Sequence, residues 1–217
     1  MRQSTKDFMS LVATSVPIHE PIYEFGSFEV PGQEGFANLR PLFPQKEYIG
    51  CDMREGPGVD KILDLHDIDL PEESVGTVLC LDTLEHVAYP YKAMEEIHRI
   101  LKPHGIAVIS SVMNFPIHDF PYDYWRFTPD AFKLLLKPFS HSFVGFAGLK
   151  NFPHIIVGIG FKSESPPLVE FMGKYETWRK RQIKSLEHLA RATVPPILLP
   201  ILSELRNSIL GLTKRSA

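Results

Sequence analysis

Acidic residues and a glycine follow two apolar runs near the start of the chain. Glu24 and Gly26 lie at the end of the run 21–25, and Asp52 follows the run 47–51. Such runs are typical of parallel strands whose carboxyl ends hold a nucleoside. A glycine after a strand lets the backbone approach a ligand closely, and an acid after the next strand can accept hydrogen bonds from both hydroxyls of a ribose. The spacing therefore predicts a site for a nucleoside-containing cofactor.

The elements that must position these residues alternate between strand and helix. We predict strands at 21–25, 47–51, 60–64, 75–81 and 106–110, an antiparallel hairpin of strands at 142–147 and 154–161 at the sheet edge, and helices at 4–16, 33–40, 90–101 and 128–136. Thr128 suits the cap of the last of these helices. Residues 54–58 are typical of a loop, so we expect the helix between the second and third strands to be reduced to a turn. This alternation predicts an α/β fold with a parallel sheet.

Length and composition restrict the class of protein. The chain has 217 residues, enough for one well-buried domain with an appendage, and its net charge of -3 gives no reason to expect nucleic acid as a partner. Cys51 and Cys80 lie in predicted strands, which indicates buried thiols, and no histidine and cysteine residues have the spacing of a metal site. Neither a secretory signal nor an apolar run of about 20 residues is apparent, so we expect a cytoplasmic protein without a bound metal.

Longer motifs carry a resemblance that covers residues 20–161. These motifs are Glu24–Ser27, Asp52, Asp64–Asp67, Leu81–Val87 and Arg99–Gly105. With them in this order, the chain resembles the class I S-adenosylmethionine-dependent methyltransferases, especially the small bacterial type-11-like family. The resemblance implies a Rossmann-like, doubly wound, mostly parallel sheet of seven strands with an antiparallel last strand. We therefore expect a cofactor-binding domain at 1–163 and, where the composition changes, a C-terminal helical extension at 164–217.

The resemblance also implies which residues hold S-adenosylmethionine. They are Glu24, Gly26, Ser27, Asp52, Met53, Asp64, Leu65, Leu81 and Asp82. Asp52 would hold the ribose, Met53 would pack on adenine, and Asp64 would accept a hydrogen bond from the adenine amino group. Other interpretations stay open: Glu24 as a surface acid, Asp52 as the partner of Arg54 in a loop ion pair, and Asp64 as a residue that caps its turn.

A segment dense in aromatic residues, 114–127, follows the fifth predicted strand. Ligands of open α/β sheets bind at this edge, so we predict that the segment forms the wall and lid of the acceptor site. Its proposed acceptor contacts are Asn114, Tyr124, Trp125 and Arg126. The alternatives are that the aromatic side chains simply cap the sheet and that Arg126 pairs with Asp123.

Transfer of a methyl group from a sulfonium needs alignment more than it needs protein chemistry. A hydroxyl acceptor additionally benefits from a base, and His86 and His118 are the candidates for that role. The alternative for His86 is a structural or cofactor-neighbouring histidine. By association with the family, we expect a small-molecule or glycan-like acceptor.

Two rival functions and several roles for the C-terminal segment remain open from the sequence. A nicotinamide-dependent oxidoreductase is disfavoured because Ser27 and Phe28 follow Gly26, which leaves no glycine-rich dinucleotide fingerprint. A non-enzymatic Rossmann-fold protein that binds a partner is the second rival. Residues 166–217 carry apolar helical faces beside the basic run Arg179–Arg181. They are expected either to pack on the sheet, to fold over the site, to form a dimer face or to dock on a membrane surface.

Overall fold

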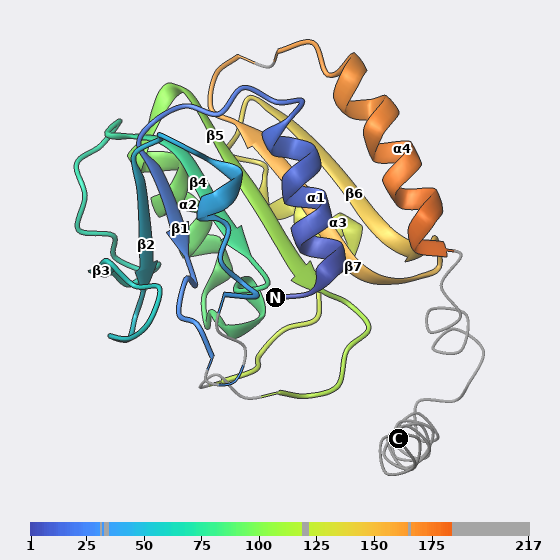
Figure 1. Ribbon diagram of the computed structural model, residues 1–217, viewed down its shortest axis with the longest axis horizontal. Helices are drawn as coiled ribbons and strands as arrows, with labels where there is room; N and C mark the ends of the chain where they lie inside the picture. The colour runs from blue at the N-terminus through green and yellow to red at the C-terminus, as the bar shows by residue number, and fades with distance from the viewer. Residues whose placement is uncertain (31, 33–34, 119–121, 165, 184–217) are drawn as a thin grey trace, which may run out of the picture.

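A computed structural model describes residues 1–30, 32, 35–118, 122–164 and 166–183. Within these residues the chain forms a seven-stranded sheet with strand order β3-β2-β1-β4-β5-β7-β6 (Figure 1). The strands are β1 (Ile22–Phe25), β2 (Tyr48–Asp52), β3 (Lys61–Ile62), β4 (Val75–Leu81), β5 (Leu101–Val112), β6 (His141–Leu149) and β7 (Phe152–Phe161). The first five strands are parallel, and β7 runs antiparallel to both β5 and β6. The expected sheet and its terminal hairpin are confirmed.

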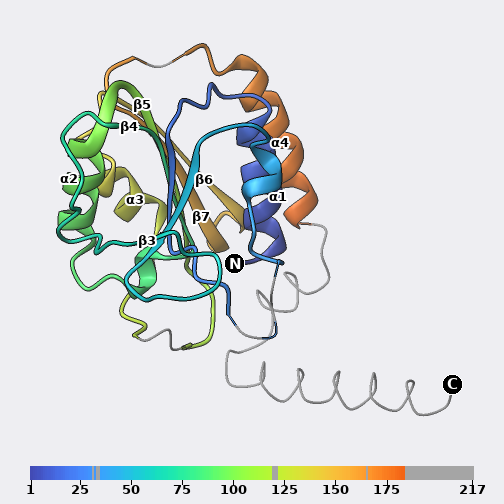
Figure 2. The same ribbon diagram turned by 60° about the vertical axis from the view of Figure 1, so that its left-hand side comes forward.

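Helices cover both faces of the sheet, so the molecule has three layers (Figure 2). The helices are α1 (Gln3–Ala13), α2 (Pro90–Ile100), α3 (Pro129–Leu135) and α4 (Val169–Ile183), with 3-10 turns η1 (Arg40–Leu42) and η2 (Leu84–His86). One face is covered by α1 and α4, and the other by α2 and α3. The order of the strands reverses between β1 and β4, and a ligand of such a sheet binds at the carboxyl ends of the strands near that point.

Each face of the sheet has its own apolar core. Met94 and Ile97, one helical turn apart on α2, are buried with Phe132 of α3 in the core on one side. The core on the other side contains Phe8 of α1 and Phe171 of α4. Burial of one such side chain contributes about 1.5–3 kcal/mol, so the two cores fix the strands whose ends form the site.

The C-terminal helix α4 packs against the rest of the chain. Phe171, Tyr175 and Trp178 are buried, and the Tyr175 hydroxyl hydrogen-bonds the backbone of Phe146 on β6. Phe171 and Trp178 also contact Phe8 of α1 through their rings. For this part of the C-terminal segment the expectation of packing on the sheet is confirmed, whereas the expected helices after Ile183 lie outside the described residues.

Local differences from the expected elements have physical causes. The helix expected at 33–40 is wrong for residues 35–39, which form turns, and Gly35 has a φ of +72°, outside the helical region. The strand expected at 106–110 begins earlier, since β5 already includes residues 101–105, and its pairing with β4 shifts register between Val75 and Thr77. The crossover from β2 to β3 is a turn, as expected, and Thr128 caps α3 by accepting a hydrogen bond from the Ala131 amide. Among the described residues, no helix combines the length and apolar character needed to cross a membrane.

Candidate active site

A cavity of about 470 Å³ opens at the carboxyl ends of β1, β2, β4 and β5. Its volume lies within the range of about 300–1,000 Å³ that is usual for small-molecule sites. Seven of the nine residues expected to hold the cofactor line it: Gly26, Asp52, Met53, Asp64, Leu65, Leu81 and Asp82. Of the expected catalytic and acceptor residues, His86, His118 and Tyr124 line it as well. One cavity therefore contains both residues expected to bind the cofactor and residues expected to act on the acceptor.

The turn after β1 brings the backbone against the cavity at Gly26. Its φ is +87°, a conformation that glycine adopts readily, and a Cβ there would lie 2.2 Å from Thr83 Oγ1. Phe28, which stands where the family usually has a second glycine, lines the cavity with its ring. The Arg54 guanidinium carbon lies over the face of that ring, 4.4 Å from the ring centroid. The same ring fills the space that a side chain at Gly56 would need.

The Asp52 carboxylate at the end of β2 is held on one side only. Its Oδ1 accepts hydrogen bonds from the backbone amide and Nε of Arg54, at 3.1 and 3.2 Å. Among the described residues, no hydrogen bond is made to Oδ2. The expected ion pair with Arg54 is thus present, and it orients the carboxylate while leaving an acceptor oxygen for a ribose hydroxyl.

The turn after β3 presents a second carboxylate in the same way. Asp64 Oδ1 accepts from the His66 amide at 2.8 Å and lies 2.7 Å from His66 Nδ1. Partial burial acts to raise the pKa of Asp64, but the hydrogen bonds from His66 outweigh it and lower that pKa. Asp64 therefore caps its turn and keeps a charged oxygen at the cavity. Met53 and Leu65 supply apolar surface beside it, and Met53 is 58% exposed, which leaves its side chain accessible to an aromatic base.

The start of α1 fixes Asp82, which follows β4. Asp82 Oδ2 accepts hydrogen bonds from the Arg2 amide at 3.2 Å and from Thr5 Oγ1 at 2.9 Å. Its Oδ1 accepts from Ser110 Oγ at 2.7 Å, and its φ is +49°. Met1 and Arg2 also line the cavity. The residues just before α1 and in its first turn thus contribute to the site, although no pattern in their own sequence indicated it.

Two residues expected at the cofactor, Glu24 and Ser27, are not among those that line the cavity. The Glu24 side chain lies on the other face of β1 from Phe25, and its Oε2 accepts a hydrogen bond from the Tyr48 hydroxyl at 2.6 Å. Burial raises the pKa of Glu24 to about 7, although Tyr48 and Arg40 act to lower it. The carboxyl therefore faces a protein environment, not the cavity.

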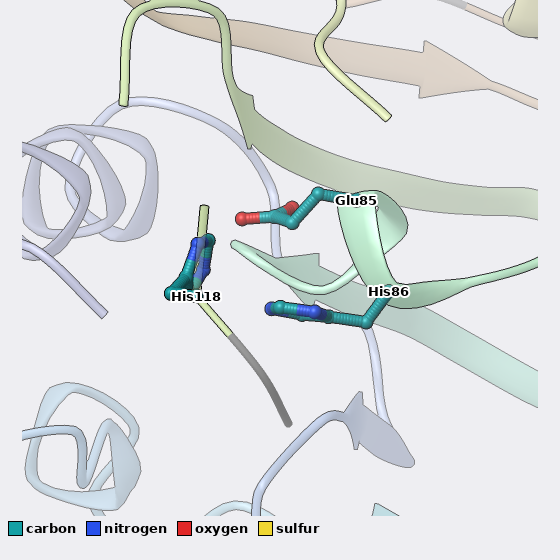
Figure 3. A group of neighbouring side chains, drawn as sticks. All are labelled: Glu85, His86 and His118. Carbon is teal, nitrogen blue, oxygen red and sulfur yellow. The ribbon is translucent and has the colours of Figure 1, made fainter. Parts of the chain in front are cut away.

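Three chemically active side chains meet at the other end of the cavity (Figure 3). Glu85 and His86 come from η2, and His118 comes from the loop after β5. Glu85 is buried, and its Oε2 accepts a hydrogen bond from Ser111 Oγ at 2.6 Å. Burial and the neighbouring Asp82 raise the pKa of Glu85, and burial lowers the pKa of His86. Both shifts favour the uncharged forms of these side chains.

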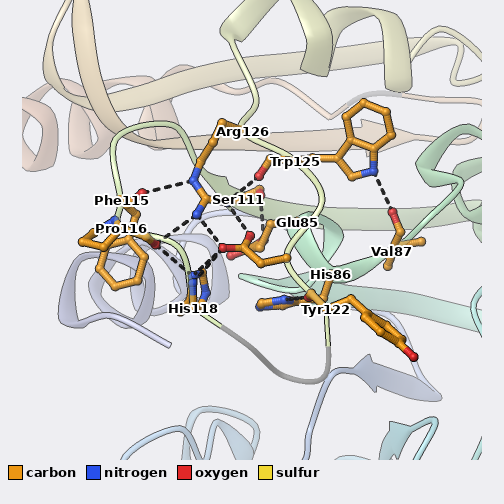
Figure 4. Close-up of polar contacts among 11 residues, drawn as sticks. Glu85, His86, Val87, Ser111, Phe115, Pro116, His118, Tyr122, Trp125 and Arg126 are labelled. Carbon is orange, nitrogen blue, oxygen red and sulfur yellow. Dashed lines mark hydrogen bonds and ion pairs between the residues drawn. The ribbon is translucent and has the colours of Figure 1, made fainter.

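The loop after β5 is held together by Arg126 (Figure 4). Its guanidinium donates to both Asp123 carboxylate oxygens, at 2.5 and 2.6 Å, and to the carbonyls of Phe115, Pro116 and Trp125. These hydrogen bonds hold the pKa of Asp123 well below its usual range. The sequence alternative of an Arg126–Asp123 pair is therefore present, and the guanidinium shapes the loop instead of pointing into the cavity.

Two further expected acceptor residues also lie outside the cavity lining. The Trp125 indole Nε1 donates to the Val87 carbonyl at 2.9 Å, and Asn114 is half-buried. Tyr124 does line the cavity, and its backbone amide donates to the Glu85 carbonyl at 2.8 Å. The lid is thus tied to η2 through backbone hydrogen bonds. Glu85 itself was missed as a site residue, although it lies within the motif Leu81–Val87.

Comparisons with known proteins agree on one class. The family model described as "Methyltransferase domain" matches residues 45–109, which include β2, β3, β4, α2 and the cavity residues at the ends of β2 and β4. A search of curated proteins gives no significant match.

Solved structures share the fold at low sequence identity. An S-adenosylmethionine-dependent methyltransferase from Thermotoga maritima has a TM-score of 0.55 at 16% identity, covering 74% of this chain and 89% of that one. Burkholderia thailandensis 1,6-didemethyltoxoflavin-N1-methyltransferase, solved with its substrate and S-adenosylhomocysteine, has a TM-score of 0.52 at 15% identity over 75% and 79% of the two chains. A chain of the Haloferax volcanii complex between a methyltransferase and the Trm112 methyltransferase activator has a TM-score of 0.53 at 15% identity over 73% and 90%.

The fold is Rossmann-like, and its cavity lies at the carboxyl ends of the strands, where sheets of this kind bind nucleoside-containing cofactors. The methyltransferase-domain match over residues 45–109, together with the shared fold, supports a class I S-adenosylmethionine-dependent methyltransferase with S-adenosylmethionine as its cofactor. The oxidoreductase and non-enzymatic alternatives are accordingly set aside.

Proposed function

We propose that this methyltransferase transfers a methyl group by in-line displacement to a hydroxyl of a small-molecule or glycan-like acceptor. The observation that carries the proposal is the continuity of the cavity. Asp52 and Asp64 line one end, and His86, His118 and Tyr124 line the other. A methyl donor and its acceptor must lie in contact for displacement, and one continuous cavity that reaches both sets of residues supports that arrangement.

The residues present fit the cofactor. Gly26 lines the cavity with backbone alone and has no room for a side chain beside Thr83, and the Asp52 and Asp64 carboxylates each keep one oxygen for a hydrogen-bond donor. In this proposal Asp52 holds the ribose, Asp64 holds the adenine amino group, and Met53, Leu65 and Phe28 flank the adenine ring. Leu81, Asp82 and the Gly26 backbone border the methionine end. When bound, S-adenosylmethionine supplies an electrophilic methyl group on a sulfonium.

The protein's own contribution at the acceptor end is to orient a hydroxyl and to accept its proton. His86 Nδ1 lies 2.5 Å from the Tyr122 carbonyl, so Nδ1 carries the hydrogen and Nε2 keeps a lone pair. Burial lowers the pKa of His86 and keeps that lone pair available. His118 is the second candidate base. The aromatic rings of Tyr122 and Tyr124, both at the cavity, offer flat apolar surface of the kind that sugar rings use.

The cofactor part of the proposal is tested by calorimetric titration with S-adenosylmethionine, S-adenosylhomocysteine and NAD. We expect binding of the first two and not of NAD. Equal binding of NAD, or no binding of S-adenosylhomocysteine, would contradict the assignment.

The acceptor part is tested by single-turnover methyl transfer to a panel of sugars, glycans and phenols. Once an acceptor is found, His86→Ala and His118→Ala are compared with His141→Ala, which removes an exposed imidazole of β6 that does not line the cavity. Full turnover in both of the first two variants would exclude a histidine base.

A further inference from the structure

Glu85, His86 and His118 each present one donor atom to the same small space, and these three atoms all lie within 4.8 Å of one another. Figure 3 shows the carboxylate and the two imidazoles converging from η2 and from the loop after β5. Even if every separation were at that limit, a point equidistant from the three atoms would lie about 2.8 Å from each. Bonds to a transition-metal ion are about 2.0–2.2 Å long, so each donor needs to move by less than about 1 Å to reach one.

In both histidines Nδ1 faces hydrogen-bond acceptors, which leaves Nε2 available to a metal ion. His86 Nδ1 faces the Tyr122 carbonyl at 2.5 Å. His118 Nδ1 lies 3.2 Å from both the Pro116 carbonyl and Asp123 Oδ2. Carbonyl and carboxylate oxygens only accept, so each Nδ1 carries a hydrogen, and in the neutral imidazole each Nε2 then holds the lone pair that a metal ion can use. A histidine whose other nitrogen donates to a carboxylate or carbonyl is the usual form of a metal ligand.

The Glu85 carboxylate supplies an independent observation. It is only 1% exposed, and Ser111 Oγ binds its Oε2. Among the described residues, no hydrogen-bond partner reaches its Oε1. A buried carboxylate oxygen without a partner costs free energy, so proteins normally give such an atom a hydrogen bond or a cation. Figure 3 shows the carboxylate directed toward the two imidazoles.

We propose that Glu85, His86 and His118 bind a divalent first-row transition-metal ion, with Glu85 Oε1 and the two Nε2 atoms as its ligands. Two imidazoles and one carboxylate suit Zn²⁺, Fe²⁺ or Co²⁺ better than Mg²⁺ or Ca²⁺, which prefer oxygen ligands. Three protein ligands leave further coordination positions open, as in catalytic sites. All three residues line the cavity, so those open positions face the space assigned to the acceptor.

The surroundings of the three ligands hold them in place (Figure 4). Ser111 orients Glu85, and Asp123 orients His118. Arg126 neutralises the charge of the Asp123 carboxylate. The charges near the site are mixed: Asp82 and Asp123 are negative, whereas Arg2 and Arg126 are positive. Arg126 is fully engaged in the loop, so it is not positioned to replace a cation at Glu85.

The consequence for catalysis rests on the proposed function. An ion held by Glu85, His86 and His118 would lower the pKa of a coordinated acceptor hydroxyl, which would then release its proton to water without needing a histidine base. The metal-bound enzyme would then favour acceptors with an oxygen that can reach the ion beside the methyl donor. An imidazole nitrogen cannot hold a proton and a metal ion at the same time. A measurement can therefore distinguish the protonated from the metal-bound form of His86 and His118.

The test is titration of the metal-free full-length protein with Co²⁺, followed by visible absorption, and with Zn²⁺, followed by calorimetry. We expect one ion per chain. Glu85→Gln, His86→Ala and His118→Ala should each weaken binding at least 100-fold, since even residues that only orient a ligand affect affinity by about 10- to 100-fold. The matched control is His66→Ala, which removes another cavity histidine and should leave metal affinity within about 3-fold.

Two results would overturn the metal site. The first is the absence of stoichiometric Co²⁺ binding by the wild type. The second is undiminished Co²⁺ binding by His118→Ala, a change at a half-buried position of the loop after β5. S-adenosylhomocysteine binding is measured on every variant as a check of folding. It also separates the two proposals. Cofactor binding without metal binding refutes only the metal site, and metal binding without cofactor binding refutes only the proposed function.

Discussion

Replacement of Glu24 by glutamine should stabilise the protein at neutral and alkaline pH. The Glu24 side chain is 6% exposed, and its Oε2 accepts a 2.6 Å hydrogen bond from Tyr48. Other charges that act on it are Arg40 and the N-terminal amine, which favour its ionised form, and Glu29, which opposes it. Burial outweighs the favourable contacts and raises the pKa of Glu24 to about 7, so the folded protein prefers the neutral carboxyl.

The direction of the pH dependence follows from this shift. The pKa rises from 4.5 in the unfolded chain to about 7 in the folded protein, so the folded state binds more protons between these values. Its free energy of unfolding therefore falls as the pH rises through that window. At 1.36 kcal/mol per pKa unit, the Glu24 contribution falls by about 2–3 kcal/mol between pH 5 and pH 8. Glutamine keeps an acceptor for the Tyr48 hydroxyl but has no charge to bury.

The assay is urea unfolding of the wild type and Glu24→Gln at pH 5, 6, 7 and 8. The difference in unfolding free energy between the two proteins should move in favour of the variant by about 2–3 kcal/mol across this range. Because the comparison uses the change of this difference with pH, any effect of the amide on the unfolding free energy that does not depend on pH cancels. Glu95→Gln, at an exposed position of α2, is the control and should run parallel to the wild type.

A difference that stays constant with pH would refute the reasoning, because it would mean that Glu24 is charged in the folded protein throughout. The same variant also separates two interpretations of the residue. If the Glu24 carboxylate contacts the cofactor, Glu24→Gln should weaken S-adenosylhomocysteine binding. Its position outside the cavity lining instead leads us to expect less than about a 3-fold change, since no charge-assisted hydrogen bond worth about 1.5–3 kcal/mol is removed.

Three further changes test the site and its support. Asp52→Ala should weaken S-adenosylhomocysteine binding by about 10- to 100-fold in calorimetry, because it removes charge-assisted hydrogen bonds, whereas Glu55→Gln, at an exposed position of the loop that follows β2, should bind normally. Gly26→Ala should lower the unfolding free energy by about 1–3 kcal/mol, because of its positive φ and the close Thr83 hydroxyl; unchanged urea unfolding would contradict this. Thr128→Ala should cost about 1 kcal/mol by removing the cap of α3, and unchanged thermal unfolding would show that the cap is dispensable.

The sequence was sufficient to predict the sheet because its pattern is local and repetitive. The run Val75–Leu81 is apolar except for Thr77 and is buried at every position, so its assignment as a central strand needed no other information. The Thr-Pro-Asp signal at 128–130 likewise encodes a helix start within three residues. The failure at 33–40 has the opposite cause: Phe36 and Leu39 have helical spacing, but Gly35 adopts a conformation that no helix contains.

The site was harder to predict because its contacts join distant segments. Nothing near Asp82 indicated that Arg2 and Thr5 of α1 would bind its carboxylate. Nor could spacing alone bring His118 to Glu85 and His86, because metal motifs are recognised by short separations and this group depends on how a long loop folds back over η2. Arg126 could be predicted to pair with Asp123, but the carbonyls that occupy its other donors are visible only in the folded loop.

One arrangement recurs at both ends of the cavity. Asp52 and Asp64 each have one oxygen fixed by a neighbour in the chain, and Glu85 has one oxygen fixed by Ser111. In the imidazoles of His86 and His118 it is Nδ1 that is fixed, by acceptors from the loop after β5. Each group is thus oriented by one atom while its second atom remains available to a ligand. Because the orientation is set before a ligand binds, less ordering is required at the moment of binding, and the reacting groups can be aligned by the protein alone. This is the form of catalysis that methyl transfer requires.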